Sequence, residues 1–181
     1  IEMLRHIIEN SESVVFFGGA GVSTESGIPD FRGNGGLYTK ESDDISPEEK
    51  LHISYLMSNP RGFYEYYKGN MICTWAKPND AHLILSQLEG EGKLKAVITQ
   101  NIDGLHQMAG SKNVIELHGS THRSYCVGCG EKYTLDYVLE KGDVPYCEKC
   151  GGIVRPDVVL YGEGLDGEAW QRAEDAIYNC D

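Results

Sequence analysis

Positive charge is scarce in this sequence of 181 residues, because 16 lysines and arginines stand against 28 aspartates and glutamates, a formal net charge of −12. A nucleic-acid-binding surface needs clustered cations to neutralise phosphates, so the composition argues against a nucleic-acid partner. Long hydrophobic runs are also missing. The most apolar stretch, residues 14–22, contains three glycines and is much shorter than the roughly 20 residues that span a bilayer. We therefore expect no membrane partner either.

The first residues lack the basic region and the small-residue cleavage site of a secretory signal, which predicts a cytoplasmic location. The rest of the composition is typical of folded proteins, with 40% hydrophobic and 24% charged residues. The length fits one domain, or one domain that carries a small insert. Glycine is enriched, with 22 residues, which indicates that the backbone itself has special tasks.

Short apolar runs alternate with helical patterns along much of the chain. The runs at 14–17, 96–99 and 114–117 are typical of strands that are buried on both faces of a parallel sheet. Helical spacing of apolar residues predicts helices at 2–10, 81–88 and 168–178, the last with Ala169, Ala173, Ala176 and Ile177 facing inward. This alternation predicts the α/β class.

Two stretches interrupt that alternation. Residues 37–77 are polar and aromatic, with a helix expected around Phe63, Tyr64, Tyr66 and Tyr67, and we interpret them as a helical insert. Residues 121–152 carry four cysteines and form a second insert. A further strand is expected at 157–161, where the α/β pattern resumes. The sheet-forming parts are then about 1–36, 78–120 and 153–181.

Three motifs fall where predicted strands end. Glycine-rich residues 18–23 follow the first strand, and such a loop lets a phosphate approach backbone N–H groups, although a simple tight turn would use the same residues. Gln100, Asn101 and Asp103 follow the second strand, at the edge where open α/β sheets bind ligands. A turn with a helix cap is the alternative there. His118 ends the third strand and is a candidate general base, although a lone histidine is more often structural.

The four cysteines form two pairs with metal-ligand spacing, Cys126-x-x-Cys129 and Cys147-x-x-Cys150. Four thiolates complete a tetrahedral zinc site and leave no open position for water, so we expect one structural Zn²⁺ ion with no part in a reaction. Disulfides or free thiols are the alternative reading of the same residues. Cys73 and Cys180 are left over and receive no role.

Taken in order, GAGVSTESGIPDFRG, TQNID, HG, the two Cys-x-x-Cys pairs and RPDVVLYGE resemble the sirtuin family of NAD-dependent protein-lysine deacylases. The resemblance covers most of the chain. It implies a doubly wound, Rossmann-like parallel sheet that binds NAD, and a smaller lobe built from a helical insert and a zinc ribbon. It also implies an acyl-lysine protein or peptide as the substrate.

The resemblance carries residue roles with it. Contacts with NAD are implied for Gly19, Ala20, Gly21, Thr24, Asp30, Phe31, Arg32, Gln100, Asn101, Ile102, Asp103 and His118. In this assignment the carboxamide of nicotinamide lies at Ile102 and Asp103. The catalytic residues are Asn101, on the ribose side, and His118, the general base. A substrate strand would pair with the segment that holds Val158, Val159 and Tyr161.

The reaction that the resemblance implies is deacetylation of lysine. The acyl oxygen attacks the ribose carbon that loses nicotinamide, and the acyl group ends on ADP-ribose. Sirtuins that remove acidic acyl groups have a Tyr and an Arg three residues apart, where Tyr67 and Asn70 stand here, so acetyl is favoured over succinyl. Two alternatives stay open, namely ADP-ribosyl transfer to a protein and an inactive zinc-containing fragment.

The sequence departs from the family pattern at two places. Tyr161 stands where the family usually has Phe, a change that keeps an aromatic side chain. Family members also continue into further strands that hold the adenosine half of NAD. We therefore expect these residues to be a truncated catalytic domain that binds NAD poorly by itself.

Overall fold

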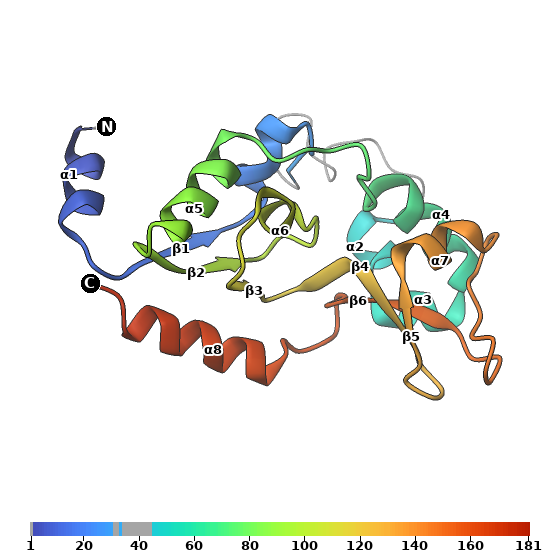
Figure 1. The fold of residues 1–181 in the computed structure, drawn as a ribbon. Helices are drawn as coiled ribbons and strands as arrows, with labels where there is room; N and C mark the ends of the chain where they lie inside the picture. Colours follow the sequence, from blue (N-terminus) through green and yellow to red (C-terminus); the bar gives the residue numbers. More distant parts are fainter. Residues whose placement is uncertain (1, 31–32, 34–44) are drawn as a thin grey trace. The chain divides into compact units, whose positions relative to one another are not determined.

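The computed structural model describes residues 2–30, 33 and 45–181, and their helices and strands are labelled in Figure 1. They fall into two compact units that are interleaved along the chain. The first unit consists of Ile1–Ile28, Ala76–His118 and Leu165–Asp181. The second unit consists of Pro29–Trp75 and Gly119–Gly164.

The first unit is built on a parallel sheet of three strands in the order β1-β2-β3. The strands are β1 (Val14–Gly18), β2 (Leu94–Thr99) and β3 (Val114–Glu116). All three strand predictions for this unit are confirmed, and the pairing is parallel throughout. The central strand β2 is the most buried, as its continuous apolar run indicates.

Five helical segments accompany this sheet: α1 (Glu2–Asn10), the 3₁₀ helix η1 (Ala20–Ser26), α5 (Asp80–Gly90), α6 (Leu105–Ala109) and α8 (Gly167–Tyr178). Side chains fix where two of them begin, since Asn79 accepts from Ala81 N and Asp166 accepts from Ala169 N. The helices predicted at 2–10, 81–88 and 168–178 therefore exist, with ends within two residues.

The apolar core of the first unit joins the sheet to α8. Its buried members are Ala96, Ile98, Ile115, Leu117 and Ala173, with Val15, Ala169 and Ala176 packed against them. Ile177 was expected to face inward with these alanines, but half of its surface is exposed. Ala173 is buried and Ala169 and Ala176 are half-buried beside it, so the face of α8 that packs on the core consists of alanines.

In its described residues, the second unit combines four helices with an antiparallel sheet in the order β5-β4-β6. The helices are α2 (Pro47–Lys50), α3 (Ile53–Ser58), α4 (Pro60–Asn70) and α7 (Leu135–Glu140). The strands are β4 (Gly119–Cys126), β5 (Lys132–Thr134) and β6 (Val154–Val158). The aromatic helix expected in the helical insert is α4.

The strand predicted at 157–161 is misplaced. Strand β6 covers Val154–Val158 and pairs antiparallel with β4, so it does not continue the parallel sheet. The sequence gives a weak strand signal here, because Pro156 and Asp157 are poor strand residues. The apolar residues that follow leave the strand because Leu160 N turns toward the carboxylate of Glu163.

Aromatic rings from α4 form the centre of the second unit. Phe63 stacks on Tyr67 with 5.5 Å between ring centroids, and Tyr64 meets both rings edge-on. The Tyr64 hydroxyl donates to the Val154 carbonyl, which ties α4 to β6. Burial raises the pKa of both tyrosines far above the ordinary value.

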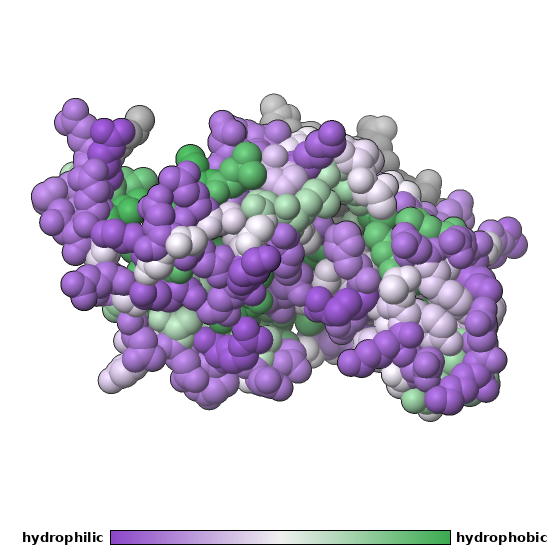
Figure 2. All heavy atoms as spheres, in the orientation of Figure 1, coloured by the Kyte–Doolittle hydropathy of each residue, from purple (hydrophilic) through white to green (hydrophobic). Residues whose placement is uncertain are grey.

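The surface facing the viewer in Figure 2 is mostly hydrophilic, with separate hydrophobic patches between the charged groups. Among the described residues, none of the helices has the length and apolar character that crossing a membrane requires.

Candidate functional site

The ends of the three parallel strands bring the predicted motifs of the first unit to one edge of the sheet (Figure 1). Gly18 pairs with Thr99, and Thr99 pairs with Glu116, so the loops after all three strands start side by side. Two further backbone bonds extend the ladder, from Gln100 N to Gly18 O at 3.0 Å and from Leu117 N to Thr99 O at 2.9 Å. This is the edge at which open α/β sheets bind ligands.

The glycine-rich loop leads directly into η1, and its backbone is suited to an anion. The first internal bond runs from Val22 N to Gly19 O at 3.0 Å, so the N–H groups of Ala20 and Gly21 precede it. A Cβ atom at Gly19 would lie 3.7 Å from the Gln100 amide, in van der Waals contact with it. Thr24 binds back to Gly21 O at 2.9 Å. These groups fit a diphosphate.

Ser23 connects the glycine-rich loop to the loop after β2. Its buried hydroxyl donates to Asp103 Oδ2 at 2.7 Å and accepts from Asn101 Nδ2 at 3.0 Å. Asp103 Oδ1 in turn accepts from Leu105 N at 2.9 Å at the start of α6. The network fixes an amide and a carboxylate at the sheet edge. Sequence reasoning gave Ser23 no role, although its place in the glycine-rich motif was a signal.

His118 is oriented by a backbone carbonyl. Its Nδ1 lies 2.9 Å from Gln100 O, and because a carbonyl oxygen only accepts, Nδ1 must carry the proton. The neutral ring therefore has an unprotonated Nε2 that can accept a proton from another group. The half-buried ring combines a fixed orientation with a basic nitrogen, as a general base requires.

A buried pair of histidines lies in the same unit. The rings of His82 and His106 are 4.6 Å apart between centroids, and both side chains are almost fully buried. Asn79 N donates to His82 Nδ1 at 3.3 Å, whereas His106 has no hydrogen-bond partner for either ring nitrogen within the described residues. Burial and the neighbouring His82 lower the pKa of His106 to about 4, although Asp103 opposes the shift.

The other predicted contacts belong to the second unit or lie outside the described residues. Asp30 closes a turn by accepting from Gly33 N at 2.6 Å. Phe31 and Arg32 lie outside the residues that the structure describes. Val158 is the last residue of β6, and Tyr161 forms an isolated bridge with His52.

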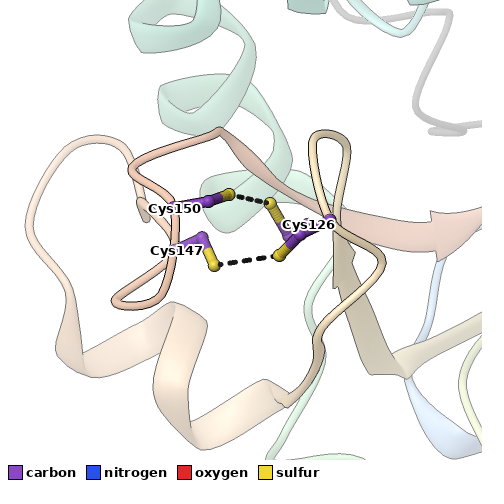
Figure 3. A group of neighbouring side chains, drawn as sticks. Cys126, Cys147 and Cys150 are labelled. Carbon is purple, nitrogen blue, oxygen red and sulfur yellow. Dashed lines mark hydrogen bonds between the residues drawn. The ribbon is translucent and has the colours of Figure 1, made fainter.

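The four predicted zinc ligands converge in the second unit. All four Sγ atoms lie within 4.8 Å of one another, with Cys126 and Cys150 at 3.3 Å and Cys129 and Cys147 at 3.6 Å (Figure 3). A tetrahedron with Zn–S bonds of about 2.3 Å places sulfurs roughly 3.8 Å apart, so the cluster fits one zinc ion. No other group of three or more possible ligands occurs among the described residues.

Matching turns present the two cysteine pairs. Each pair is followed by a glycine with φ of +72°, Gly130 in one turn and Gly151 in the other. Each of these glycines donates its N–H to the carbonyl of the first cysteine in its pair. Outside the turns, the Tyr133 hydroxyl donates to Cys147 Sγ at 3.1 Å, which stabilises the thiolate and lowers the pKa of Cys147 to about 6. This hydrogen bond favours the thiolate form of Cys147, which is the form that binds a metal ion.

Comparisons with known proteins agree with this geometry. The model of the Sir2 family matches residues 19–181. An "NAD-dependent protein deacetylase" of Clostridium acetobutylicum is 54% identical over 183 residues, which cover 100% of this chain and 75% of the relative. The chain thus spans about three quarters of this curated relative.

Solved structures of Sir2 proteins also match almost the whole chain. A Sir2 structure with deacetylated p53 peptide and 3'-O-acetyl ADP-ribose matches with a TM-score of 0.89 and 43% identity, over 99% of this chain and 72% of that one. A Sir2 structure with p53 peptide and NAD⁺ matches with a TM-score of 0.83 and 41% identity, also over 99% and 72%. The sheet edge, the cysteine cluster and these matches lead to one conclusion: the chain belongs to the Sir2 family, the sirtuins.

Proposed function

We propose that this protein is an NAD-dependent protein-lysine deacetylase that transfers the acetyl group of a lysine side chain to ADP-ribose and releases nicotinamide. The observation that carries the proposal is the hydrogen bond from His118 Nδ1 to Gln100 O, which leaves a basic Nε2 at the edge of the sheet. The relative from Clostridium acetobutylicum and the Sir2 complexes support the same activity.

Different residues of the first unit bind different parts of NAD. The N–H groups at Gly19, Ala20 and Gly21 hold the diphosphate, and Thr24 closes the loop behind them. Ser23 holds Asn101 and Asp103 in place, so that the amide faces the ribose and the loop at Ile102 and Asp103 receives the carboxamide. Gln100 belongs to the same edge of the sheet, and for Asp30, Phe31 and Arg32 a contact with NAD rests on the sequence resemblance alone.

His118 moves the proton of the reaction. When bound, NAD supplies the ribose carbon that accepts the acyl oxygen as nicotinamide leaves. His118 Nε2 then accepts the proton of a ribose hydroxyl while Nδ1 stays bonded to Gln100 O, so the ring keeps its orientation as it becomes charged. Asn101, held by Ser23, positions the ribose for this transfer.

The zinc ion holds structure only. Cys126, Cys129, Cys147 and Cys150 would fill its coordination shell, which leaves no position for water or substrate. We propose that residues 37–77 and 121–152 are the helical insert and the zinc module of a domain whose Rossmann-like parts are about 1–36, 78–120 and 153–181. Reduced thiolates are compatible with the cytoplasmic location that the sequence predicts.

The substrate is an acyl-lysine protein or peptide. We assign its backbone to the segment with Val158, Val159 and Tyr161, where an extended peptide can pair with main-chain groups. Side chains of the peptide contribute little to such pairing, so sequence preference should be loose.

Mass spectrometry tests the reaction. The purified zinc-loaded protein is incubated with an acetyl-lysine peptide and with NAD in large excess, because weak binding of NAD is expected. We expect nicotinamide, free lysine peptide and O-acetyl-ADP-ribose in equal amounts. His118→Ala should lower kcat by about 10²–10⁴-fold, the range for loss of a general base, with zinc content unchanged. His122→Ala, at an exposed histidine four residues away, should stay within about twofold of wild type.

Other outcomes decide between the alternatives. ADP-ribose attached to a protein acceptor, without O-acetyl-ADP-ribose, would replace deacetylation by ADP-ribosyl transfer. No NAD-dependent product from a folded, zinc-loaded protein would contradict the proposed function. Faster release of succinyl than of acetyl groups would overturn the prediction from Tyr67 and Asn70 alone.

A further inference from the structure

An ion pair between buried Arg155 and half-buried Glu163 closes the segment that we assign to the substrate. Arg155 precedes it and Glu163 follows it, and Nη1 and Nη2 of the arginine face Oε1 and Oε2 of the carboxylate at 2.5 and 2.7 Å. This is a bidentate arrangement, the strongest geometry for such a pair. Only 5% of Arg155 is exposed. The pair raises the pKa of Arg155 and lowers that of Glu163.

Both partners also bind the backbone between them. Arg155 Nη2 donates to Val158 O at 2.8 Å, and its Nε donates to Pro156 O at 3.2 Å. Glu163 Oε2 accepts from Leu160 N at 2.9 Å. The seven residues between the charges are thus held from inside by both of them.

A second set of bonds fixes the end of the segment. Tyr161 N donates to Leu51 O at 3.1 Å, and Ile53 N donates to Tyr161 O at 3.0 Å. Next to it, Gly162 has φ of +88°, and a Cβ atom there would lie 2.6 Å from the His52 ring. Both backbone groups of Tyr161 are therefore occupied inside the unit.

These hydrogen bonds determine which backbone groups of the segment remain for pairing with a peptide. Val158 and Leu160 are buried, whereas Val159 is half-buried between them. Val158 O and Leu160 N are occupied by the two charged side chains. Val159 lies between the two occupied groups, which leaves its backbone as the place where a peptide strand can pair.

We propose that the Arg155–Glu163 pair is a positioning device that holds the backbone of residues 156–162 in the conformation that receives the acyl-lysine peptide. This inference rests on the proposed function, because it takes the substrate to be a peptide. Stability alone is a weak reason for such a pair, since buried ion pairs contribute little net stability compared with apolar replacements. Contacts with three backbone groups of one segment give the pair a specific task.

Steady-state kinetics with separate titrations of peptide and NAD test the proposal. Glu163→Gln keeps the size of the side chain but removes the charge, and we expect the KM for an acetyl-lysine peptide to rise about tenfold. The KM for NAD should stay within twofold. A merely structural role would lower the active fraction and hence kcat, without a selective change in one KM. Arg155→Lys keeps the charge without the bidentate geometry and should fall between wild type and Glu163→Gln.

The matched control removes a charge from an exposed pair that joins the neighbouring strands β4 and β6 of the same sheet. Arg123 Nε lies 2.9 Å from Asp157 Oδ2, and about half of each side chain is exposed. Arg123→Gln should leave the peptide KM unchanged. A wild-type peptide KM in Glu163→Gln, or an equal rise in Arg123→Gln, would overturn the proposal while the deacetylase activity stands.

Peptide binding separates this proposal from the proposed function. If wild-type protein shows no deacetylation, the proposed function fails, and the anisotropy of a labelled acetyl-lysine peptide then decides on the ion pair. Weaker binding by Glu163→Gln than by wild type supports the positioning role. Equal binding by the two proteins overturns it, and so does an absence of binding by wild type.

Discussion

The two units of this protein are stabilised in different ways. The first unit has a continuous apolar core in which β2 and β3 pack against small residues of α8. The second unit also buries apolar side chains, but it places polar groups among them, namely the hydroxyl of Tyr64, the Arg155–Glu163 pair and the thiol cluster. The sheet core beside α8 in the first unit therefore depends on filled volume, whereas the core of the second unit also depends on specific polar contacts.

Zinc removal is the strongest way to break this comparison. A chelator should unfold the second unit, because the binding energy of a structural zinc ion is part of the folding energy of its domain. Hydrogen exchange should then show lost protection in β4, β5 and β6, with protection kept in β1 and β2. Readdition of zinc should restore it. Equal loss in both sheets would contradict the independence of the two units.

A cavity in the sheet core tests the first unit. Ile98 is fully buried in β2, so Ile98→Ala should lower the free energy of unfolding by about 2–5 kcal/mol. Urea denaturation followed by circular dichroism measures this change, and zinc content should stay at one ion per chain. Ile177→Ala is the control, because that side chain is half exposed. An equally large loss of unfolding free energy in Ile177→Ala would show that burial in the sheet core does not explain the effect of Ile98→Ala.

Acid should weaken the first unit through its buried histidines. The pKa of His106 is about 4 in the folded chain and near 6.5 when unfolded, so the unfolded chain binds the proton first as pH falls. The contribution of the neutral His106 to the free energy of unfolding is fully present above pH 6.5. It is lost between pH 6.5 and 4, by about 1–3 kcal/mol after allowance for screening.

Urea denaturation at several pH values measures this loss. His106→Leu should flatten the slope of unfolding free energy against pH in that window, whereas His6→Gln, on the exposed α1, should keep it. An unchanged slope in His106→Leu would show that His106 is not the source of the pH dependence of stability.

The smallest effect is expected from an exposed ion pair of the second unit. Arg61 Nη2 lies 3.0 Å from Asp143 Oδ2, but about three quarters of the arginine side chain is exposed. Arg61→Ala should therefore cost no more than about 1 kcal/mol, as measured by thermal unfolding. A larger loss of unfolding free energy would show that exposed ion pairs also stabilise this unit. The exposed Arg61 would then differ less from the buried Arg155 in its effect on stability.

Local patterns predicted much of the fold and of the zinc site. The apolar runs of β1, β2 and β3 are strand signals by themselves. The spacing of the four cysteines by itself predicts a tetrahedral zinc site. The position of β6 was missed because Pro156 and Asp157 weaken the strand signal. Its pairing with β4 depends on contacts that no local pattern contains.

The interior of the candidate site was predicted less completely. Gln100, Asn101 and His118 were expected at the sheet edge because each follows a strand. Ser23 was not assigned, since its role arises from a bond to Asp103, 80 residues further along the chain. The burial of His106 likewise depends on its contact with a ring from another helix. Such roles are set by tertiary contacts and not by spacing.

The interleaving of the two units bears on the order in which the chain folds. Strands β1 and β2 are adjacent in the sheet, yet the residues 29–75 of the second unit separate them along the chain. Closing a long loop costs entropy, and a segment that is already compact shortens the effective loop. The 119–164 stretch lies between β3 and α8 in the same way. Early collapse of the second unit, with its metal, would thus lower the kinetic barrier to completing the parallel sheet.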